Sequence, residues 1–200
     1  HLSGDPGGDY RSEAVDPDEW GVIVGAKNAR LSALAGFTTV RDLGSAQLVG
    51  FVLRDGTAKG WIPGSRILSA GTSISIIGGH GDVSGFRPEV TAALAGGNTC
   101  TGAIQCAARV REASKRGADV IKITATGGVL SQQGRGLGQH FTDEEMSAIV
   151  TTAHGLGLKV AAHAHGARGI EGAAKAGVDS IEHGTFADAA ALKMMKANGS

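Results

Sequence analysis

The stretch "RGADVIKITATGG" at residues 116–128 decides the fold. Its first glycine, Gly117, follows an amphipathic segment and precedes an apolar run that is rich in Val and Ile. Glycine suits the position just after a helix, because it adopts the left-handed conformation that other residues resist. A short apolar run of β-branched residues is typical of a strand that is buried on both faces. The stretch therefore predicts a helix, a tight turn and a strand.

The same unit occurs three more times, at Gly36 before "FTTV", at Gly157 before "LKVAAHA" and at Gly177 before "VDSIEH". Helix starts are also recognisable, since Asp16-Pro17 offers a cap with proline in the first turn and Thr142 with Glu145 forms a capping-box pattern. Alternating helices and strands predict a parallel sheet with right-handed crossovers. We expect strands near residues 38–41, 66–69, 119–124, 159–164 and 180–183.

Both a doubly wound open sheet and a TIM-type (β/α)8 barrel fit this strand count, and the strand ends favour the barrel. In barrels, reactive side chains lie at the carboxyl ends of several different strands. Polar residues fall at or near the carboxyl ends of the predicted strands at Arg41-Asp42, Lys122, His163, His165 and Glu182-His183. A dinucleotide-binding sheet would have its glycine fingerprint directly after the first strand. The only similar segment, "GRGLG" at residues 134–138, is interpreted as part of a loop.

Composition excludes several classes of function. The 200 residues carry 19 Lys and Arg against 19 Asp and Glu, and this balance argues against a nucleic-acid or anionic-membrane partner. No apolar run approaches the roughly 20 residues of a membrane-spanning helix. Cys100 and Cys106 lack the spacing of a zinc or redox motif, and we expect both to be ordinary small buried residues without a disulfide.

The side chains of the 119–124 strand predict that Lys122 points into the barrel. Val120, Lys122 and Thr124 share one face, and Ile121 and Ile123 share the other, which should meet the helices. A buried lysine must be neutralised, paired or used chemically, because burial of a bare ammonium is costly. Either His163 or His183 alone suits a structural role, but together at equivalent strand ends, beside an inward lysine, they indicate a metal site.

An ordered set of segments runs along nearly the whole chain: "HLSGDP", "GFTTVRDLG", "IPGSRIL", "GGHGD", "GADVIKITATGGVLS", "VAAHAHGARGI" and "GVDSIEHGTF". In these segments the sequence resembles the amidohydrolase superfamily, in the imidazolonepropionase-like branch that includes Xaa-Pro dipeptidases (prolidases) and related carboxypeptidases. The resemblance implies a partial catalytic barrel over residues 1–200, with strands two to six and the tip of strand one. Strands seven and eight, and any small β-sandwich domain, would lie outside this chain.

The resemblance also implies a binuclear metal site held by His1, Lys122, His163 and His183. Lys122 would be carboxylated by carbon dioxide, and the carbamate would bridge two divalent ions, taken as Zn²⁺. The aspartate that accepts a proton on strand eight would lie beyond Ser200. Such a metallopeptidase uses metal-activated hydroxide against an amide carbonyl. The expected reaction is release of a C-terminal amino acid from a dipeptide or an N-acyl amino acid.

Substrate contacts are expected from three further residues. His80 in the glycine-rich loop would bind a substrate carboxylate or the oxyanion, or else stabilise its loop. His165 stands where prolidase-like relatives often have tyrosine, so it would face the substrate. Arg41 would anchor a carboxylate or pair with an acid as scaffold. His140 and His154 are interpreted as structural.

Two alternatives to this function stay open: hydrolysis of a cyclic amide, as in imidazolonepropionase, and a non-catalytic barrel scaffold. We expect a small-molecule or dipeptide substrate, no nucleic-acid or membrane partner, and a homo-oligomer, since a truncated barrel exposes strand edges that invite pairing. The fragment alone is expected to be inactive, and the sequence leaves the cellular location open.

Overall fold

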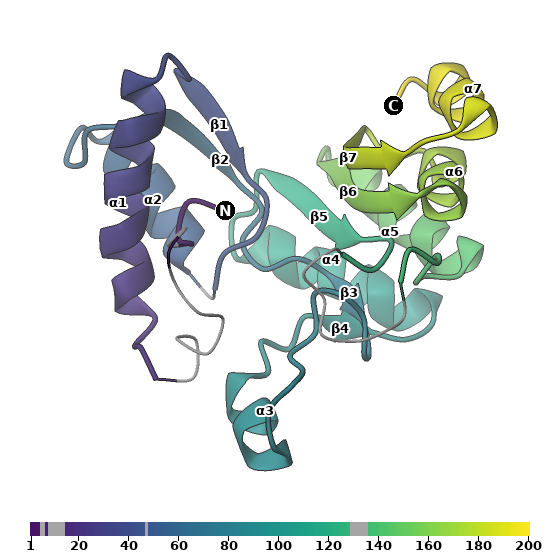
Figure 1. Cartoon of the computed structure of the whole chain (residues 1–200), viewed down its shortest axis with the longest axis horizontal. Coiled ribbons are helices and arrows are strands. Elements are labelled where there is room, and N and C mark those ends of the chain that lie inside the picture. Colours follow the sequence, from purple (N-terminus) through teal and green to yellow (C-terminus); the bar gives the residue numbers. More distant parts are fainter. Residues whose placement is uncertain (5–6, 8–14, 47, 129–135) are drawn as a thin grey trace. The chain divides into compact units, whose positions relative to one another are not determined.

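The computed structural model describes residues 1–4, 7, 15–46, 48–128 and 136–200 (Figure 1). These residues form two compact units, each of which is described by itself. The first comprises His1–Thr72 and Gly117–Val120, and the second comprises Ser73–Arg116 and Ile121–Ser200. Residues 5–6 and 129–131 of the quoted family segments, and residues 134–135 of the glycine-rich loop, lie outside the described residues.

The first unit packs two helices against a pair of parallel strands. Its elements are α1 (Glu19–Leu34), β1 (Thr39–Asp42), α2 (Val49–Ala58) and β2 (Arg66–Ser69). Strands β1 and β2 pair in register from Thr39 with Arg66 to Asp42 with Ser69. Helix α1 begins at Glu19 with Asp18 as its N-cap, so the start expected at Asp16-Pro17 was slightly early.

The core of the first unit forms where the two helices approach the strands. Ala29, Val49, Leu53 and Ile67 are buried together there. Gly25 on α1 permits the close approach of α2, because a Cβ at Gly25 would lie 2.3 Å from a methyl group of Leu53.

The second unit contains a three-stranded sheet with the order β5-β6-β7, which is also the chain order. A doubly wound sheet would instead reverse its strand order at a switch point. Along the chain, helices α4 to α7 alternate with these three strands (Figure 1). The elements of this unit are β3 (Ser75–Ile76), α3 (Pro88–Leu94), β4 (Thr99–Cys100), α4 (Ala103–Lys115), β5 (Val120–Thr124), α5 (Asp143–Gly155), β6 (Lys159–Gly166), α6 (Ala167–Ala176), β7 (Ser180–Phe186) and α7 (Ala189–Asn198).

The five predicted strands correspond to β1, β2, β5, β6 and β7. The two-residue strands β3 and β4 were not predicted, because two residues carry no periodic pattern. The described strand pairs with an assigned register are parallel, and the described residues form no closed barrel. Within the described part of the chain, no helix combines the length and apolar character needed to cross a membrane.

The helix-turn-strand repeat of the sequence corresponds to a repeated hydrogen-bond pattern in the structure. In the first unit, the backbone N–H of Asp119 donates to the Ser69 carbonyl at 2.9 Å, and the Asp119 carboxylate accepts from the Ser69 amide at 2.9 Å. In the second unit, Asp179 forms the same pair of bonds with Val160, both at 2.8 Å. Each aspartate follows a Gly-x pair and directly precedes a strand, so the Gly-x-Asp sequence forms the same hydrogen bonds at the starts of β5 and β7.

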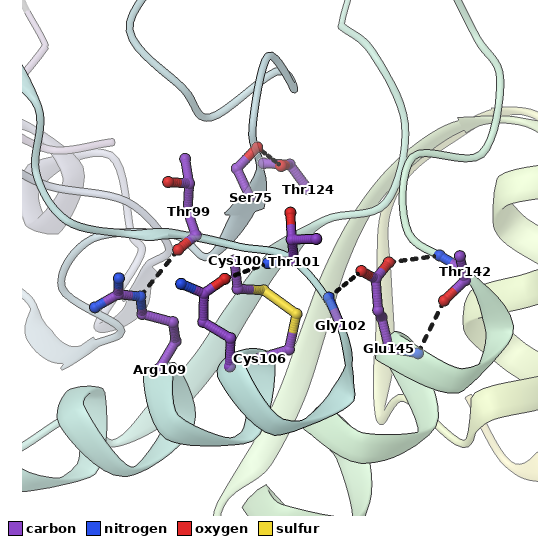
Figure 2. Close-up of a disulfide and its surroundings, with 11 residues drawn as sticks. Ser75, Thr99, Cys100, Thr101, Gly102, Cys106, Arg109, Thr124, Thr142 and Glu145 are labelled. Atoms are coloured by element: carbon purple, nitrogen blue, oxygen red, sulfur yellow. Dashed lines mark hydrogen bonds between the residues drawn. A yellow bond between two sulfur atoms is a disulfide. The ribbon is translucent and has the colours of Figure 1, made fainter.

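The two cysteines form a disulfide, which corrects the expectation that both are free. Cys100 ends β4 and Cys106 lies in the first turns of α4, and both side chains are fully buried (Figure 2). Sequence spacing alone did not reveal the bond, because the pairing depends on how the strand end and the helix start meet in space. The disulfide therefore ties the start of α4 to the end of β4.

Next to the disulfide, the predicted capping box of α5 is confirmed. Thr142 accepts from the Glu145 amide at 3.2 Å, and the Glu145 carboxylate accepts from the Thr142 amide at 2.8 Å. The second oxygen of Glu145 accepts from the Gly102 amide at 2.7 Å (Figure 2). Glu145 thus joins the start of α5 to the loop that precedes α4.

Candidate active site

The second unit brings histidines from two neighbouring strands to one place. His163 and His165 lie on β6 with one residue between them, and their side chains are only 5% and 6% exposed. Lys122 on β5 is also buried, at 6% exposure. Alternation along a strand directs His163 and His165 to the same face.

His183 joins these histidines through an unusual backbone conformation. The register pairs His183 with Ala164, which lies on the opposite face of β6 from His163 and His165. His183 has a φ of 75°, and the register shifts by a bulge between Ala164 and Gly166. Its imidazole centroid nevertheless lies 4.7 Å from those of both His163 and His165. A left-handed conformation at a non-glycine residue is typical of a functional site.

A fourth imidazole comes from the loop after β3. The ring of His80 stacks on that of His163, with centroids 4.3 Å apart and an interplanar angle of 29°. Gly128, which follows β5, leaves room for this ring, because a Cβ there would lie 2.4 Å from Cε1 of His80. His80 therefore has His163 and the Gly128 backbone as neighbours.

Electrostatics favour the neutral form of these imidazoles. Burial lowers the pKa of His163 to about 3, against the opposing effect of a hydrogen bond to the Gly127 carbonyl. Burial also lowers the pKa values of His80 and His183, and the nearby charge of Lys122 lowers both further. Neutral imidazole is the form that binds metal ions.

Hydrogen bonds from the surrounding chain hold the rings in position. Nε2 of His163 lies 3.2 Å from the Gly127 carbonyl oxygen, and Nδ1 of His165 lies 2.8 Å from Oγ1 of Thr185. The Thr126 hydroxyl accepts from the His165 amide at 3.0 Å and donates to the Gly127 carbonyl at 2.8 Å. Thr126 thus connects the end of β5 to the histidine-bearing part of β6.

The donor set fits a divalent metal ion. The candidate ligand nitrogens of His163, His165 and His183 all lie within 4.8 Å of one another. Imidazole nitrogen is a preferred ligand of Zn²⁺ and other first-row divalent ions. Lys122 is buried on β5 and acts electrostatically on His80 and His183.

The remaining predicted site residues, His1 and Arg41, belong to the first unit and stay predictions as members of this site. The His1 ring contacts the Gly44 carbonyl oxygen. The backbone amide of Leu2 donates to the Asp42 carboxylate at 3.1 Å. These contacts hold His1 beside the carboxyl end of β1. Arg41 is an exposed residue of β1.

Sequence reasoning missed four residues that surround the histidines: Thr126, Gly127, Gly128 and Thr185. Their positions just after β5 and near the end of β7 could have identified them as site residues, because functional side chains lie at the carboxyl ends of barrel strands. The structural role expected of His154 agrees with the structure, in which its ring contacts the Asp179 carboxylate at 2.9 Å.

Comparison with known proteins gives a match to the amidohydrolase family over residues 1–199. Ochratoxinase from Aspergillus niger is 35% identical over 181 residues, which cover 82% of this chain and 36% of that protein. Its crystal structure superposes with a TM-score of 0.85 at 30% identity, over 99% of this chain and 48% of that one.

Two solved peptidases are also similar. A Xaa-Pro dipeptidase with methionine bound in its active site is 42% identical with a TM-score of 0.81, over 91% of this chain and 45% of that one. A prolidase complexed with N-methylphosphonate-L-proline is 32% identical with a TM-score of 0.80, over 94% and 47%. The chain thus spans about half the length of these structures, and the likeness implies a TIM-barrel-like α/β fold.

Proposed function

This chain belongs to the amidohydrolase family, and on that premise we propose that its full-length protein releases a C-terminal amino acid from a dipeptide or an N-acyl amino acid. The observation that carries the proposal is the convergence of His163, His165 and His183 beside the buried Lys122. The similar dipeptidase with bound methionine and the similar prolidase with a proline phosphonate support an amino acid as the released group.

We propose that His1, Lys122, His163 and His183 hold two divalent ions, taken as Zn²⁺. Such ions, when bound, lower the pKa of a coordinated water and polarise the scissile carbonyl. The family resemblance adds a carbamate on Lys122, formed when its neutral amine attacks carbon dioxide and loses a proton. The carbamate oxygens would then supply a negative charge between two cations.

The chain's own residues prepare the site before any ion binds. Burial lowers the pKa of His163 to about 3, so this ring need not release a proton in order to become a ligand, and desolvation shifts the pKa of the more exposed His183 in the same direction. The Gly127 carbonyl orients the ring of His163 from outside the cluster. Such outer hydrogen bonds fix the ring position and tautomer of a metal-bound histidine.

Recognition of the substrate is assigned to His80, His165 and Arg41. His80 stacks on His163, and its position there suits a hydrogen bond to the substrate carboxylate or to the oxyanion that forms during attack. Arg41 would hold the carboxylate of the released amino acid by a charge-assisted pair. We further propose that β1, β2, β5, β6 and β7 are strands two to six of a barrel that the rest of the protein completes.

The test is a substrate screen with the full-length protein. N-acyl amino acids and dipeptides are compared with their C-terminal amides, which lack the carboxylate, and with cyclic amides. Hydrolysis of the free acids with loss of activity on the amides is expected. Activity confined to cyclic amides would replace the peptidase assignment with the imidazolonepropionase-like alternative. Full metal content without activity on any substrate would favour a scaffold.

A further inference from the structure

We propose that Asn98 is a positioning residue for His80: its side-chain amide holds the end of the loop that carries this histidine (residues 77–82). The inference rests on the proposed function and deepens it, because it identifies what places His80 in the site. Nδ2 of Asn98 donates to the Gly81 carbonyl at 2.8 Å and to the Ser73 carbonyl at 2.7 Å. Gly81 directly follows His80 in the chain, so the first of these bonds acts on the backbone next to the histidine.

Gly81 is held at its amide as well as at its carbonyl. Its N–H donates to the Ser75 hydroxyl oxygen at 3.2 Å. The Thr124 hydroxyl, at the end of β5, donates to the same Ser75 oxygen at 3.0 Å (Figure 2). Ser75 and Thr124 are only 0% and 4% exposed, so water does not compete for the bond between them. Both polar groups of the Gly81 backbone therefore have a partner, which restrains the chain on the C-terminal side of His80.

The same bonds fix the loop relative to β5, the strand that carries Lys122. The Ile74 amide donates to the Lys122 carbonyl at 2.8 Å, and the Ile74 carbonyl accepts from the Thr124 amide at 3.1 Å. The preceding carbonyl, of Ser73, is the second acceptor of the Asn98 side chain. Asn98 therefore joins the end of the loop to a segment that is itself hydrogen-bonded to the strand with the buried lysine.

The Asn98 side chain serves the loop rather than the strand that it precedes. Strand β4 pairs with β3 through backbone groups, with Ser75 opposite Thr99 and the Asn98 carbonyl accepting from the Ser75 amide at 3.1 Å. Both acceptors of the side chain are carbonyl oxygens, and only the NH₂ end of an asparagine can donate to them. Asn98→Asp keeps the size of the side chain, removes both hydrogen bonds and sets a negative charge against two carbonyl oxygens. The end of the loop should therefore move, and the His80 ring with it.

A double-mutant cycle in the full-length protein tests whether Asn98 acts through His80. With an N-acyl amino acid or dipeptide that the wild-type protein hydrolyses, Asn98→Asp alone should lower kcat/KM about 10- to 100-fold, because displacement of a substrate-positioning group by about 1 Å can cost about 100-fold. In a His80→Ala background, the same change should cost less than about twofold, since the ring that it displaces is absent. Asn198→Asp is the matched control and should have no effect, because Asn198 also donates to a backbone carbonyl but lies at the exposed end of α7.

Nuclear magnetic resonance of the His80 ring gives a readout that does not depend on activity. The ring of His163 stacks on that of His80 at a centroid distance of 4.3 Å, so its ring current shifts the Cε1 proton signal of His80. Asn98→Asp should move this signal toward its position in an unstacked histidine, and Asn198→Asp should leave it unchanged. The signal is assigned by its loss in His80→Ala.

The outcomes separate this inference from the proposed function. If Asn98→Asp costs the same factor with and without the His80 ring, or leaves the His80 signal in place, Asn98 does not position His80, although the hydrolase assignment stands. If the wild-type protein hydrolyses no substrate, the proposed function fails, and the His80 signal alone decides the inference. Ser75→Ala removes the acceptor of the Gly81 amide and should show the same coupling to His80, so it decides the inference if the Asn98→Asp protein does not fold.

Discussion

The imidazole of His80 stacks on that of His163 at a centroid distance of 4.3 Å, which joins a loop residue to a β6 residue of the histidine cluster. The space for this contact depends on Gly128, since a side chain there would overlap the His80 ring. A residue expected to contact substrate is therefore positioned by a residue expected to bind metal and by a glycine.

Gly128→Ala should displace His80 while the proposed metal ligands stay in place. The new Cβ would lie 2.4 Å from Cε1 of His80, a distance that the ring must increase by moving. Displacement of a substrate-positioning group by about 1 Å can cost about 100-fold in rate, so kcat/KM should fall by that order. Steady-state kinetics and metal analysis check this together. Gly155→Ala is the control, since its Cβ would meet open space; equal kinetics for both variants would contradict the role of Gly128.

Lys122→Ala should abolish binuclear metal loading in the full-length enzyme. The substitution removes the amine that is proposed to form a bridging carbamate, so metal content should fall from two ions per chain to one, and hydrolysis should be lost. Elemental analysis of the purified protein measures the stoichiometry. Lys159→Ala, at the exposed start of β6, is the matched control. Two ions per chain in the Lys122→Ala protein would rule out the carbamate bridge.

Much of the fold could be predicted because each helix-turn-strand repeat carries its own local sequence signals. The glycine after each helix and the Thr142–Glu145 pattern need only a few neighbouring residues, so sequence specifies them directly. The direction of the His183 side chain could not be predicted. The register pairs His183 with Ala164, so simple alternation would direct its ring away from His163, whereas a positive φ at His183 brings the two rings together. The disulfide depends on a close approach between β4 and α4 that no spacing rule encodes.

Asp179→Asn should destabilise the protein at neutral pH. Partial burial raises the pKa of the Asp179 carboxyl, but hydrogen bonds from His154 and from the Val160 amide outweigh burial and leave the pKa below its ordinary value. A depressed pKa stabilises the fold above the ordinary aspartate pKa, and this contribution is lost as pH falls through the lower, folded-state value. The loss at neutral pH should be about 1 kcal/mol, because the carboxylate is partly solvated.

Chemical denaturation at neutral and acidic pH measures this contribution. The wild-type protein and the Asp179→Asn variant should differ at neutral pH and converge in acid, where the carboxylate is protonated. Asp18→Asn is the control, because the Asp18 side chain forms no capping hydrogen bond to α1. A constant difference across the pH range would show that the effect of Asp179 is steric rather than electrostatic.

Removal of the disulfide should lower stability without preventing folding. Cys100 and Cys106 are six positions apart, and in the chain-entropy account a loop of that length contributes about 2 kcal/mol. A Cys100→Ala/Cys106→Ala double variant should unfold at lower denaturant concentration by that amount, and alanine avoids burying an unpaired hydroxyl at two fully buried positions. Reduction of the wild-type protein should reproduce the shift and leave the double variant unchanged. Titration of the unfolded, unreduced wild-type chain should detect no free thiol, and two free thiols there would contradict the bond, because these are the two cysteines of the sequence.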